Sequence, residues 1–329
     1  MADEKSDVNT KPGETKTNLT TNKYVVGLCI GLLVVGVGCL IYYLLIVVAL
    51  EWVGKKLSDK TCYAYKDKIV NLPPIASAPI EWNDTKLIDL HIRTSHNTYI
   101  SGRQHANATS TNAIIEALDL GARCIELDVG LKNGKWVVGH GVGNGTFTTS
   151  TLTFDEMIQV IADNAFKKVD DPLFIALEIY DRDPIAAEAL YNTIMAKLGS
   201  SVYKDRYTID DQLQRVPISF ADLTLGQTRN KVLFFSKRFG NTQLDQLFEG
   251  PLTNMGTDDP NSRFLQPHGQ MNRIFPAEWY SATSLNINAI PHMSNNFNLI
   301  GMNFGCYDKH LYEYLSAFDK YCVLPMKRV

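Results

Sequence analysis

Hydrophobic and polar positions divide the chain into an N-terminal tail, an uncharged run and a patterned remainder. Residues 1–23 are rich in Lys, Thr, Asp and Glu and show no apolar periodicity, which predicts a disordered tail. Residues 24–50 contain no charged residue. Residues 54–84 end in a proline-rich stretch, which predicts a linker. From residue 85 onward, short apolar runs alternate with amphipathic stretches, as expected for a folded domain.

The uncharged run predicts one transmembrane helix over residues 24–53. About 20 apolar residues cross the hydrocarbon core of a bilayer, so this run is long enough to span it with some tilt. A cleaved signal peptide is the alternative, but its apolar region covers roughly 7–15 residues and precedes a small-residue cleavage site. Here the longer run leads into Glu51-Trp52-Val53-Gly54-Lys55-Lys56. The sequence therefore favours a single-pass membrane anchor.

Lysines near the two ends of the run indicate the orientation of the chain. They are Lys11, Lys16 and Lys23 on the N-terminal side, and Lys55, Lys56, Lys60, Lys66 and Lys68 on the C-terminal side. Because the side richer in Lys and Arg usually stays in the cytosol, this count predicts a cytosol-facing main domain. Asn-x-Thr sequons at Asn18, Asn83, Asn107 and Asn144 would suit a lumenal domain, but such short patterns occur by chance.

Beyond residue 85 the pattern predicts strands that alternate with helices. Thr153 and Glu156 have the spacing of a capping box at the start of one helix. Strands separated by helices of ten to fifteen residues favour βα units and a parallel sheet or barrel. The expected strands are 87–92, 123–129, 136–139, 174–178, 232–235 and 299–304, and the expected helices are 111–120, 153–166 and 184–198.

Ionisable and amide side chains stand at the ends of these strands. Glu126 and Asp128 are two residues apart in one strand, so their side chains point to the same side. A barrel of the TIM type builds its active site at the carboxyl ends of its strands. The residues expected there are His96, Asn97, Glu126, Asp128, His140 and Glu178.

Three carboxylates and one carboxamide that converge would repel one another without a cation. Their oxygen atoms are hard ligands, which favours Ca²⁺ or Mg²⁺ over zinc, and the flexible set favours Ca²⁺. The two histidines are suited to acid–base chemistry near neutral pH. The alternative is that each residue is separately a turn cap or a surface ion pair. That reading suits one isolated Glu-x-Asp better than six residues at consecutive strand ends.

Several motifs resemble the X region of eukaryotic phosphoinositide-specific phospholipase C. They are Ser95-His96-Asn97-Thr98-Tyr99, Gly121-Ala122-Arg123-Cys124-Ile125-Glu126-Leu127-Asp128, His140-Gly141 and Leu177-Glu178. The blocks Arg273–Trp279, Ile300–Phe304 and Tyr321–Pro325 resemble the Y region of the same family. The resemblance divides residues 85–329 into an X-like half, 85–200, and a compact Y-like half, 201–329.

This resemblance implies a fold, a cofactor and a reaction. The fold is a distorted TIM-type (β/α)8 barrel, an α/β fold preceded here by the single transmembrane helix. One Ca²⁺ would be held by Asn97, Glu126, Asp128 and Glu178. His96 and His140 would be the catalytic histidines, with Glu126 or Glu178 accepting a proton. The substrate would be a membrane phosphoinositide, hydrolysed to diacylglycerol and inositol phosphate through a cyclic phosphate.

Residues matching the family's inositol-binding positions leave the preferred phosphorylation state open. Lys237 matches one lysine of the family's Lys-x-Lys, whereas the other lysine falls on Phe235. Arg238 is a candidate substitute for the missing lysine. Arg273 matches a phosphate-binding arginine, and Phe275 replaces a tyrosine that packs on the ring. Lys237 and Arg238 also fit solvated charges at a strand end.

Composition adds two expectations. A net charge of −3 and a pI near 6.2 give no basic footprint, which argues against nucleic acid as a partner. Protein partners are not indicated. Of six cysteines, Cys29 and Cys39 lie in the apolar run, and the other four lack metal-type spacing, which predicts buried free thiols. Cys62, near the predicted membrane exit, is also a candidate for acylation.

Three competing readings remain. Glycerophosphodiester phosphodiesterases share a Glu-x-Asp strand followed by a histidine, but their first motif is His-Arg-Gly, unlike His96-Asn97-Thr98 here. Metal-independent bacterial phospholipases C carry an arginine where metal would sit, and the acidic set here argues against them. A lipid-binding pseudoenzyme would have lost a histidine or a metal ligand, and none is missing.

Overall fold

The computed structural model describes two compact units, Met1–Lys56 and Leu57–Val329. The described residues are 17–102, 104, 107–142, 148–181, 183–205, 207–209, 212, 214–240, 242–250, 253–256, 270–276 and 285–327. Residues 1–16, most of the predicted disordered tail, lie outside them.

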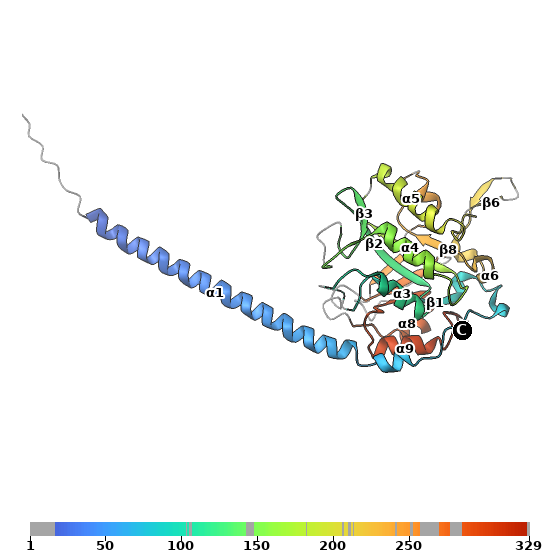
Figure 1. Cartoon of the computed structure of the whole chain (residues 1–329), viewed down its shortest axis with the longest axis horizontal. Coiled ribbons are helices and arrows are strands. Elements are labelled where there is room, and N and C mark those ends of the chain that lie inside the picture. The colour runs from blue at the N-terminus through green and yellow to red at the C-terminus, as the bar shows by residue number, and fades with distance from the viewer. Residues whose placement is uncertain are drawn as a thin grey trace, which may run out of the picture. The chain divides into compact units, whose positions relative to one another are not determined.

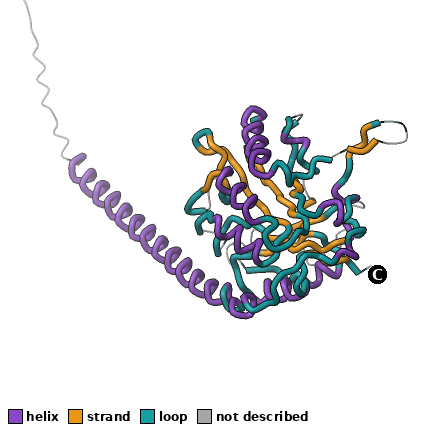
Figure 2. The backbone as a smooth tube through the Cα atoms, turned by 45° about the vertical axis from the view of Figure 1, so that its right-hand side comes forward, coloured by secondary structure: helices purple, strands orange, loops and turns teal. Residues whose placement is uncertain are grey.

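The first unit is dominated by helix α1, Thr17–Cys62, which is continuous over 46 residues (Figures 1 and 2). It starts within the stretch predicted as disordered and extends past residue 53. Its segment Val25–Leu45 has a mean hydropathy of 2.6 and no buried residues. At a rise of about 1.5 Å per residue this segment is roughly 30 Å long, the thickness of a hydrocarbon core. By length and composition, α1 can cross a membrane.

Among the described residues, the main sheet of the second unit has ten strands, and its seven parallel strands confirm the predicted barrel architecture. Along the sheet their order is β8, β5, β2, β1, β11, β10, β9. Phe234 of the outer strand β8 forms an isolated parallel bridge with Phe248, which precedes β9 in the chain, and no ladder joins β8 to β9 among the described residues. The barrel is therefore distorted there. The strands are β1 Leu90–Ser95, β2 Cys124–Lys132, β5 Leu173–Ile179, β8 Val232–Phe235, β9 Thr253–Gly256, β10 Asn272–Phe275 and β11 Leu299–Met302.

Helices follow the strands and cover the sheet from outside. Helices α3, α4 and α5 pack side by side (Figure 1). The Thr153–Glu156 capping box is confirmed at the start of α4. Asp308 caps α9 by accepting a hydrogen bond from the Leu311 N–H. The helices are α2 Lys66–Val70, α3 Thr111–Asp119, α4 Phe154–Asn164, α5 Pro184–Leu198, α6 Leu225–Thr228, α8 Ile290–Ser294 and α9 Lys309–Ala317. Short 3-10 helices are Ile80–Trp82, Leu87–Asp89, Phe220–Asp222 and Leu244–Gln246, and the remaining strands are β3 Lys135–Val138, β4 Leu152–Thr153, β6 Tyr207–Ile209, β7 Arg215–Pro217 and β12 Val323–Pro325.

Alternation along the strands separates two buried regions. On β2, Ile125, Leu127 and Val129 belong to the larger apolar cluster, which also includes residues of α3, α4 and α5. Cys124 has the opposite parity and belongs to a second cluster with Phe174, Ala176 and Phe235. Toward the carboxyl ends of the strands, the next residues on the same side as Cys124 are Glu126 and Asp128 of β2, and the next one on the same side as Phe174 and Ala176 is Glu178 of β5. One end of the interior is therefore apolar and the other carries charge.

The predicted strand 136–139 has a different role from the one expected. It forms β3, which pairs antiparallel with β2 and is therefore not one of the parallel barrel strands. The connecting turn is Asn133-Gly134, with positive φ angles of 52° and 73°. Such an Asn-Gly pair favours a tight hairpin turn, a signal that the search for alternating strands and helices overlooked. The chain returns along β2, so His140 ends up near Asp128.

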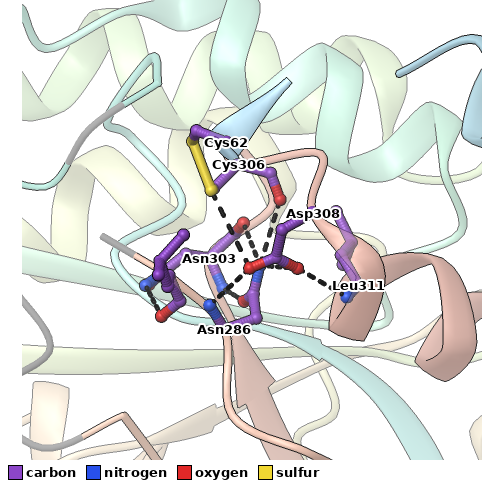
Figure 3. Close-up of a disulfide and its surroundings, with 7 residues drawn as sticks. Cys62, Asn286, Asn303, Cys306, Asp308 and Leu311 are labelled. Atoms are coloured by element: carbon purple, nitrogen blue, oxygen red, sulfur yellow. Dashed lines mark hydrogen bonds between the residues drawn. A yellow bond between two sulfur atoms is a disulfide. The ribbon is translucent and has the colours of Figure 1, made fainter. Parts of the chain in front are cut away.

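Two expectations for residues 54–84 are wrong. The segment is not a simple linker, because it contains the end of α1 and helix α2, and Ile69 is buried in the core at 1% exposure. The free-thiol prediction fails for Cys62 and Cys306, which form a disulfide (Figure 3). Their separation of 244 residues gave no spacing signal. The bond also removes Cys62 as an acylation site, whereas Cys124 and Cys322 are buried thiols as predicted.

Candidate active site

The predicted site residues lie at the carboxyl end of the barrel. The register between β2 and β5 sets Asp128 directly opposite Glu178 and Glu126 opposite Ala176. The Asn97 N–H donates to Glu126 Oε2 at 3.0 Å, which connects the loop after β1 to this group. His140 follows the hairpin, where the Gly139 N–H donates to the Asp128 carbonyl at 3.2 Å.

Arg273 lies between two of the carboxylates. Its Nη1 atom donates to Glu126 Oε1, and its Nη2 atom donates to Glu178 Oε1 at 2.9 Å. Arg273 and Glu126 are each 3% exposed. Burial raises the pKa of Glu126, but the charges of Arg273 and His96, together with hydrogen bonds from Glu178 and the Asn97 N–H, outweigh burial and hold that pKa below its usual range. The guanidinium therefore keeps Glu126 ionised.

The other two carboxylates are less well compensated. Repulsion from Glu126, followed by burial, raises the pKa of Glu178. Burial, followed by repulsion from Glu178 and Glu126, raises the pKa of Asp128. Asp128 is 2% exposed, and its Oδ1 atom has no hydrogen-bond partner among the residues that the structure describes. Leaving a buried carboxylate oxygen without a partner costs free energy, and a cation close to Asp128 would lower that cost.

Asn97 is held in a left-handed conformation, with φ of 43°, which asparagine tolerates better than most residues. Its Nδ2 donates to Gln104 Oε1 at 2.8 Å, and its Oδ1 accepts from the Tyr99 hydroxyl at 3.0 Å. These contacts fix the amide orientation. The carboxamide oxygen is thereby oriented by partners that sequence reasoning did not identify.

His96 follows β1 and is fixed through its Nδ1 atom. This nitrogen lies 2.9 Å from Asn303 Oδ1, while Nε2 lies 3.7 Å from Glu126 Oε2. An Nδ1–H donated to the Asn303 oxygen leaves Nε2 as the nitrogen on the carboxylate side. Burial lowers the pKa of His96, and the charges of Arg273 and His140 add to this effect, whereas Glu126 opposes it. In the site without substrate, burial therefore favours the neutral imidazole.

His140 is the second predicted histidine, and the structure brings it near the first. Its Nδ1 atom lies 3.3 Å from the Gln104 carbonyl oxygen. Its charge contributes to the lowered pKa of His96. Gln104 thus contacts both His140, through its main chain, and Asn97, through its side chain. Its role was not visible in the sequence because it lies in a loop outside the strand pattern.

Of the four residues expected around the inositol ring, two lie inside the site and two are exposed. The Phe275 ring stacks on His96 with centroids 5.3 Å apart, and the Arg273 guanidinium lies 4.9 Å from the Phe275 ring. Lys237 and Arg238 are exposed just beyond β8. The structure thus brings Arg273 and Phe275 into the site but leaves Lys237 and Arg238 on its rim.

Asn303 is a site residue that sequence reasoning missed. It follows β11, is 1% exposed, and is fixed by a network around Asn286 and Asp308 (Figure 3). Its N–H donates to Asn286 Oδ1 at 2.6 Å, and Asn286 in turn donates its N–H to Asp308 Oδ2 at 2.7 Å. Its position directly after an apolar strand, like that of His96, was the signal available in the sequence.

The donor set fits a hard cation but is not assembled as a closed cage. Among the described residues, no three His, Cys, Asp or Glu side chains are grouped so that they could hold a metal ion. Arg273 instead bridges Glu126 and Glu178. The unpartnered Asp128 oxygen and the excess of carboxylates over cations nevertheless match what Ca²⁺ would compensate.

The segment that contains the predicted histidines and carboxylates is similar to a known protein family. Residues 84–238 match the family model described as phosphatidylinositol-specific phospholipase C, X domain. Residues 84–238 thus form an X domain of the phosphatidylinositol-specific phospholipase C family. The X-like half predicted from the motifs, 85–200, lies entirely within this match, whereas the division at residue 200 and the Y-like half stay predictions.

Curated relatives are eukaryotic members of the phospholipase C family. The 1-phosphatidylinositol 4,5-bisphosphate phosphodiesterase delta-3-A of Danio rerio is 38% identical over 124 residues, which are 36% of this chain and 15% of that protein. The 1-phosphatidylinositol 4,5-bisphosphate phosphodiesterase beta egl-8 of Caenorhabditis elegans is 33% identical over 199 residues, 55% of this chain and 13% of that protein. The chain thus spans only a small part of these phospholipase C relatives.

A solved phospholipase C structure shares the fold. The crystal structure of PLC21 from L. pealei superposes with a TM-score of 0.62 at 19% identity, covering 76% of this chain and 39% of that one. At this identity the likeness concerns the fold alone. It agrees with the barrel traced from the strand order.

Proposed function

We propose that the chain is a calcium-dependent phosphoinositide phospholipase C. It hydrolyses phosphatidylinositol or its phosphates to diacylglycerol and inositol phosphate. The observation that carries this proposal is the convergence of His96, His140 and the carboxylates Glu126, Asp128 and Glu178 at the carboxyl end of a phospholipase C barrel.

The reaction proceeds in two steps. The inositol 2-hydroxyl attacks the 1-phosphate, a carboxylate such as Glu178 accepts the hydroxyl proton, and the diacylglycerol oxygen leaves as an alcohol after receiving a proton. Water then opens the resulting cyclic phosphate. His140 is assigned to protonating the leaving oxygen. His96 is assigned to stabilising charge on the phosphate, for which its Nε2 takes up a proton when the anionic phosphate is bound.

Asn97, Glu126, Asp128 and Glu178 would hold the Ca²⁺. The ion, when bound, lowers the pKa of the inositol hydroxyl and offsets the charge of the phosphate. Arg273 shares carboxylate partners with this site, so its guanidinium has to release at least Glu178 when the ion binds. The released guanidinium would then be available to a phosphate of the substrate.

A buried phenylalanine on β8 bears on which phosphorylation state of the lipid the site prefers. Phe235, at the position of the missing lysine, is 4% exposed and stacks on Phe174 with centroids 5.8 Å apart. A buried ring in a stack cannot supply charge to a ring phosphate. The site therefore favours phosphatidylinositol or a monophosphate over the bisphosphate.

The test is product analysis on three vesicle preparations. They contain phosphatidylinositol, its monophosphate or its bisphosphate, and the full-length protein is supplied with Ca²⁺. The proposal expects diacylglycerol and inositol phosphates, with the bisphosphate the poorest substrate. A fourth sample contains glycerophosphoinositol, and its cleavage without turnover of any intact lipid would identify a glycerophosphodiester phosphodiesterase. No turnover of any lipid would identify a pseudoenzyme.

A further inference from the structure

The disulfide lies wholly within the catalytic unit, at the end of α1. Cys62 and Cys306 are each 0% exposed, and their Cα atoms are 4.7 Å apart. Both belong to the unit Leu57–Val329. The cross-link therefore concerns the folded catalytic unit itself rather than a flexible tail.

Contacts on both sides of the disulfide hold the two segments together. The Tyr65 N–H donates to the Tyr307 carbonyl at 2.9 Å, and the rings of Tyr63 and Tyr307 stack with centroids 6.1 Å apart. Asn286 Nδ2 donates to the Cys306 carbonyl at 3.0 Å (Figure 3). The fold thus brings the two sulfur atoms together through several neighbours, so their pairing is a built feature.

Forming this bond requires an oxidising compartment. Two thiols lose two protons and two electrons, and the acceptor is a disulfide of a thiol oxidoreductase or of a small thiol, which is reduced to two thiols. The cytosol keeps protein thiols reduced, whereas the secretory lumen and the cell surface allow disulfides to form and persist. We propose that the catalytic unit lies on the non-cytosolic side of the membrane crossed by α1.

The opposing argument is the lysine count, which predicts a cytosolic domain. Two of the five lysines on the C-terminal side lie over aromatic rings of the folded unit. Lys68 Nζ lies 4.8 Å from the Tyr65 ring and 5.6 Å from the Tyr312 ring, and Lys66 Nζ lies 6.0 Å from the Tyr307 ring. Without these two, three lysines remain on each side of the run. The lysine count then no longer favours either orientation, and the disulfide favours the non-cytosolic one.

Sequons agree with the non-cytosolic orientation. Asn83 and Asn107 both belong to the catalytic unit, and both are partly exposed. Asn83 Oδ1 accepts a hydrogen bond from Arg229 Nε at 2.8 Å. On the non-cytosolic side these sequons would meet the glycosylation machinery, as they would not in the cytosol.

The experiment uses the full chain, with a C-terminal epitope tag, expressed in eukaryotic cells. Sealed microsomes are treated with protease with and without detergent. We expect a tagged fragment of the catalytic unit that survives in sealed vesicles and is lost when detergent is added. Loss of the tag in sealed vesicles would place the domain in the cytosol and overturn the proposal.

A second measurement tests the bond itself. Membranes are alkylated under denaturing conditions without reduction, digested and analysed by mass spectrometry. We expect a linked peptide pair containing Cys62 and Cys306, while Cys124 and Cys322 in the same sample are alkylated and serve as internal controls. Alkylated Cys62 and Cys306 would show that the bond does not form and would remove the observation on which the proposal rests. Neither measurement depends on phospholipase activity.

Discussion

At the scale of single residues, Arg273 and the proposed cation serve the same carboxylates. Arg273 bonds Glu126 and Glu178, and the Asp128 oxygen beside them has no partner among the described residues. One guanidinium thus offsets only part of the negative charge of three carboxylates. Metal binding and Arg273 are consequently expected to compete for Glu178.

Replacing Arg273 should therefore tighten calcium binding. In Arg273→Met the Ca²⁺ concentration at half-maximal binding should fall by about tenfold, because ~1.5 kcal/mol of charge-assisted hydrogen bonding no longer opposes the ion. Isothermal titration calorimetry measures this without substrate. Lys237→Met, which removes an exposed lysine on the rim, is the matched control and should change nothing. Weaker calcium binding in Arg273→Met would contradict the competition.

Asn303 is expected to position His96. Asn303→Ala removes the acceptor for Nδ1–H, so kcat should fall roughly tenfold or more, part of the ~100-fold or more that a placed acid–base group contributes, with little change in KM. The ¹⁵N chemical shifts of His96 should show loss of the single Nδ1–H tautomer. Asn298→Ala is the control, because Asn298 is also buried beside β11 but donates to the Ile88 and Leu90 carbonyls. If both variants lose kcat equally, Asn303 has no positioning role.

At the scale of elements, the predictable parts are those governed by local pattern. The capping box of α4, the helical periodicity of α3 and the two-residue alternation on β2 are local, and all are found. The role of β3, the packing of residues 54–84 and the Cys62–Cys306 pair depend on contacts distant in sequence. Site residues after strands were predictable for the same local reason, whereas Gln104 and Arg273's carboxylate pairing needed the tertiary structure.

The β2–β3 hairpin offers a test at this scale. Gly134 has φ of 73°, and a Cβ added there would meet no atom within 4 Å. Gly134→Ala should therefore cost only the backbone strain of a left-handed alanine, about 1 kcal/mol of unfolding free energy. Gly250→Ala, also without neighbours but without a positive φ, should be close to neutral. Chemical denaturation measures both, and equal losses would refute the turn assignment.

At the scale of the whole molecule, α1 and the catalytic unit divide two tasks. The buried core residues of both apolar clusters lie within residues 69–323, in the catalytic unit. The apolar segment Val25–Leu45 contributes none of them. A helix that crosses the membrane would keep the site at high effective concentration near its lipid.

Removing residues 1–56 should therefore leave the catalytic unit folded but no longer hold it at the membrane. The remaining chain retains both cysteines of the disulfide and should unfold cooperatively. It should hydrolyse a soluble short-chain phosphatidylinositol at the rate of the full chain, while hydrolysis of vesicles containing the long-chain lipid should fall by roughly 100-fold, within the range expected from tethering. Equal rates on vesicles would show that α1 does not deliver the enzyme to its substrate.

The central claim is that oxygen ligands at the barrel's carboxyl end support calcium-dependent hydrolysis of an inositol phospholipid. The most direct measurement is release of inositol phosphates from phosphatidylinositol vesicles by the full-length protein, in Ca²⁺ and in chelator, beside an Asp128→Asn variant. We expect release in Ca²⁺, its loss in chelator, and a much higher Ca²⁺ requirement for the variant. Equal release in Ca²⁺ and in chelator would contradict the account.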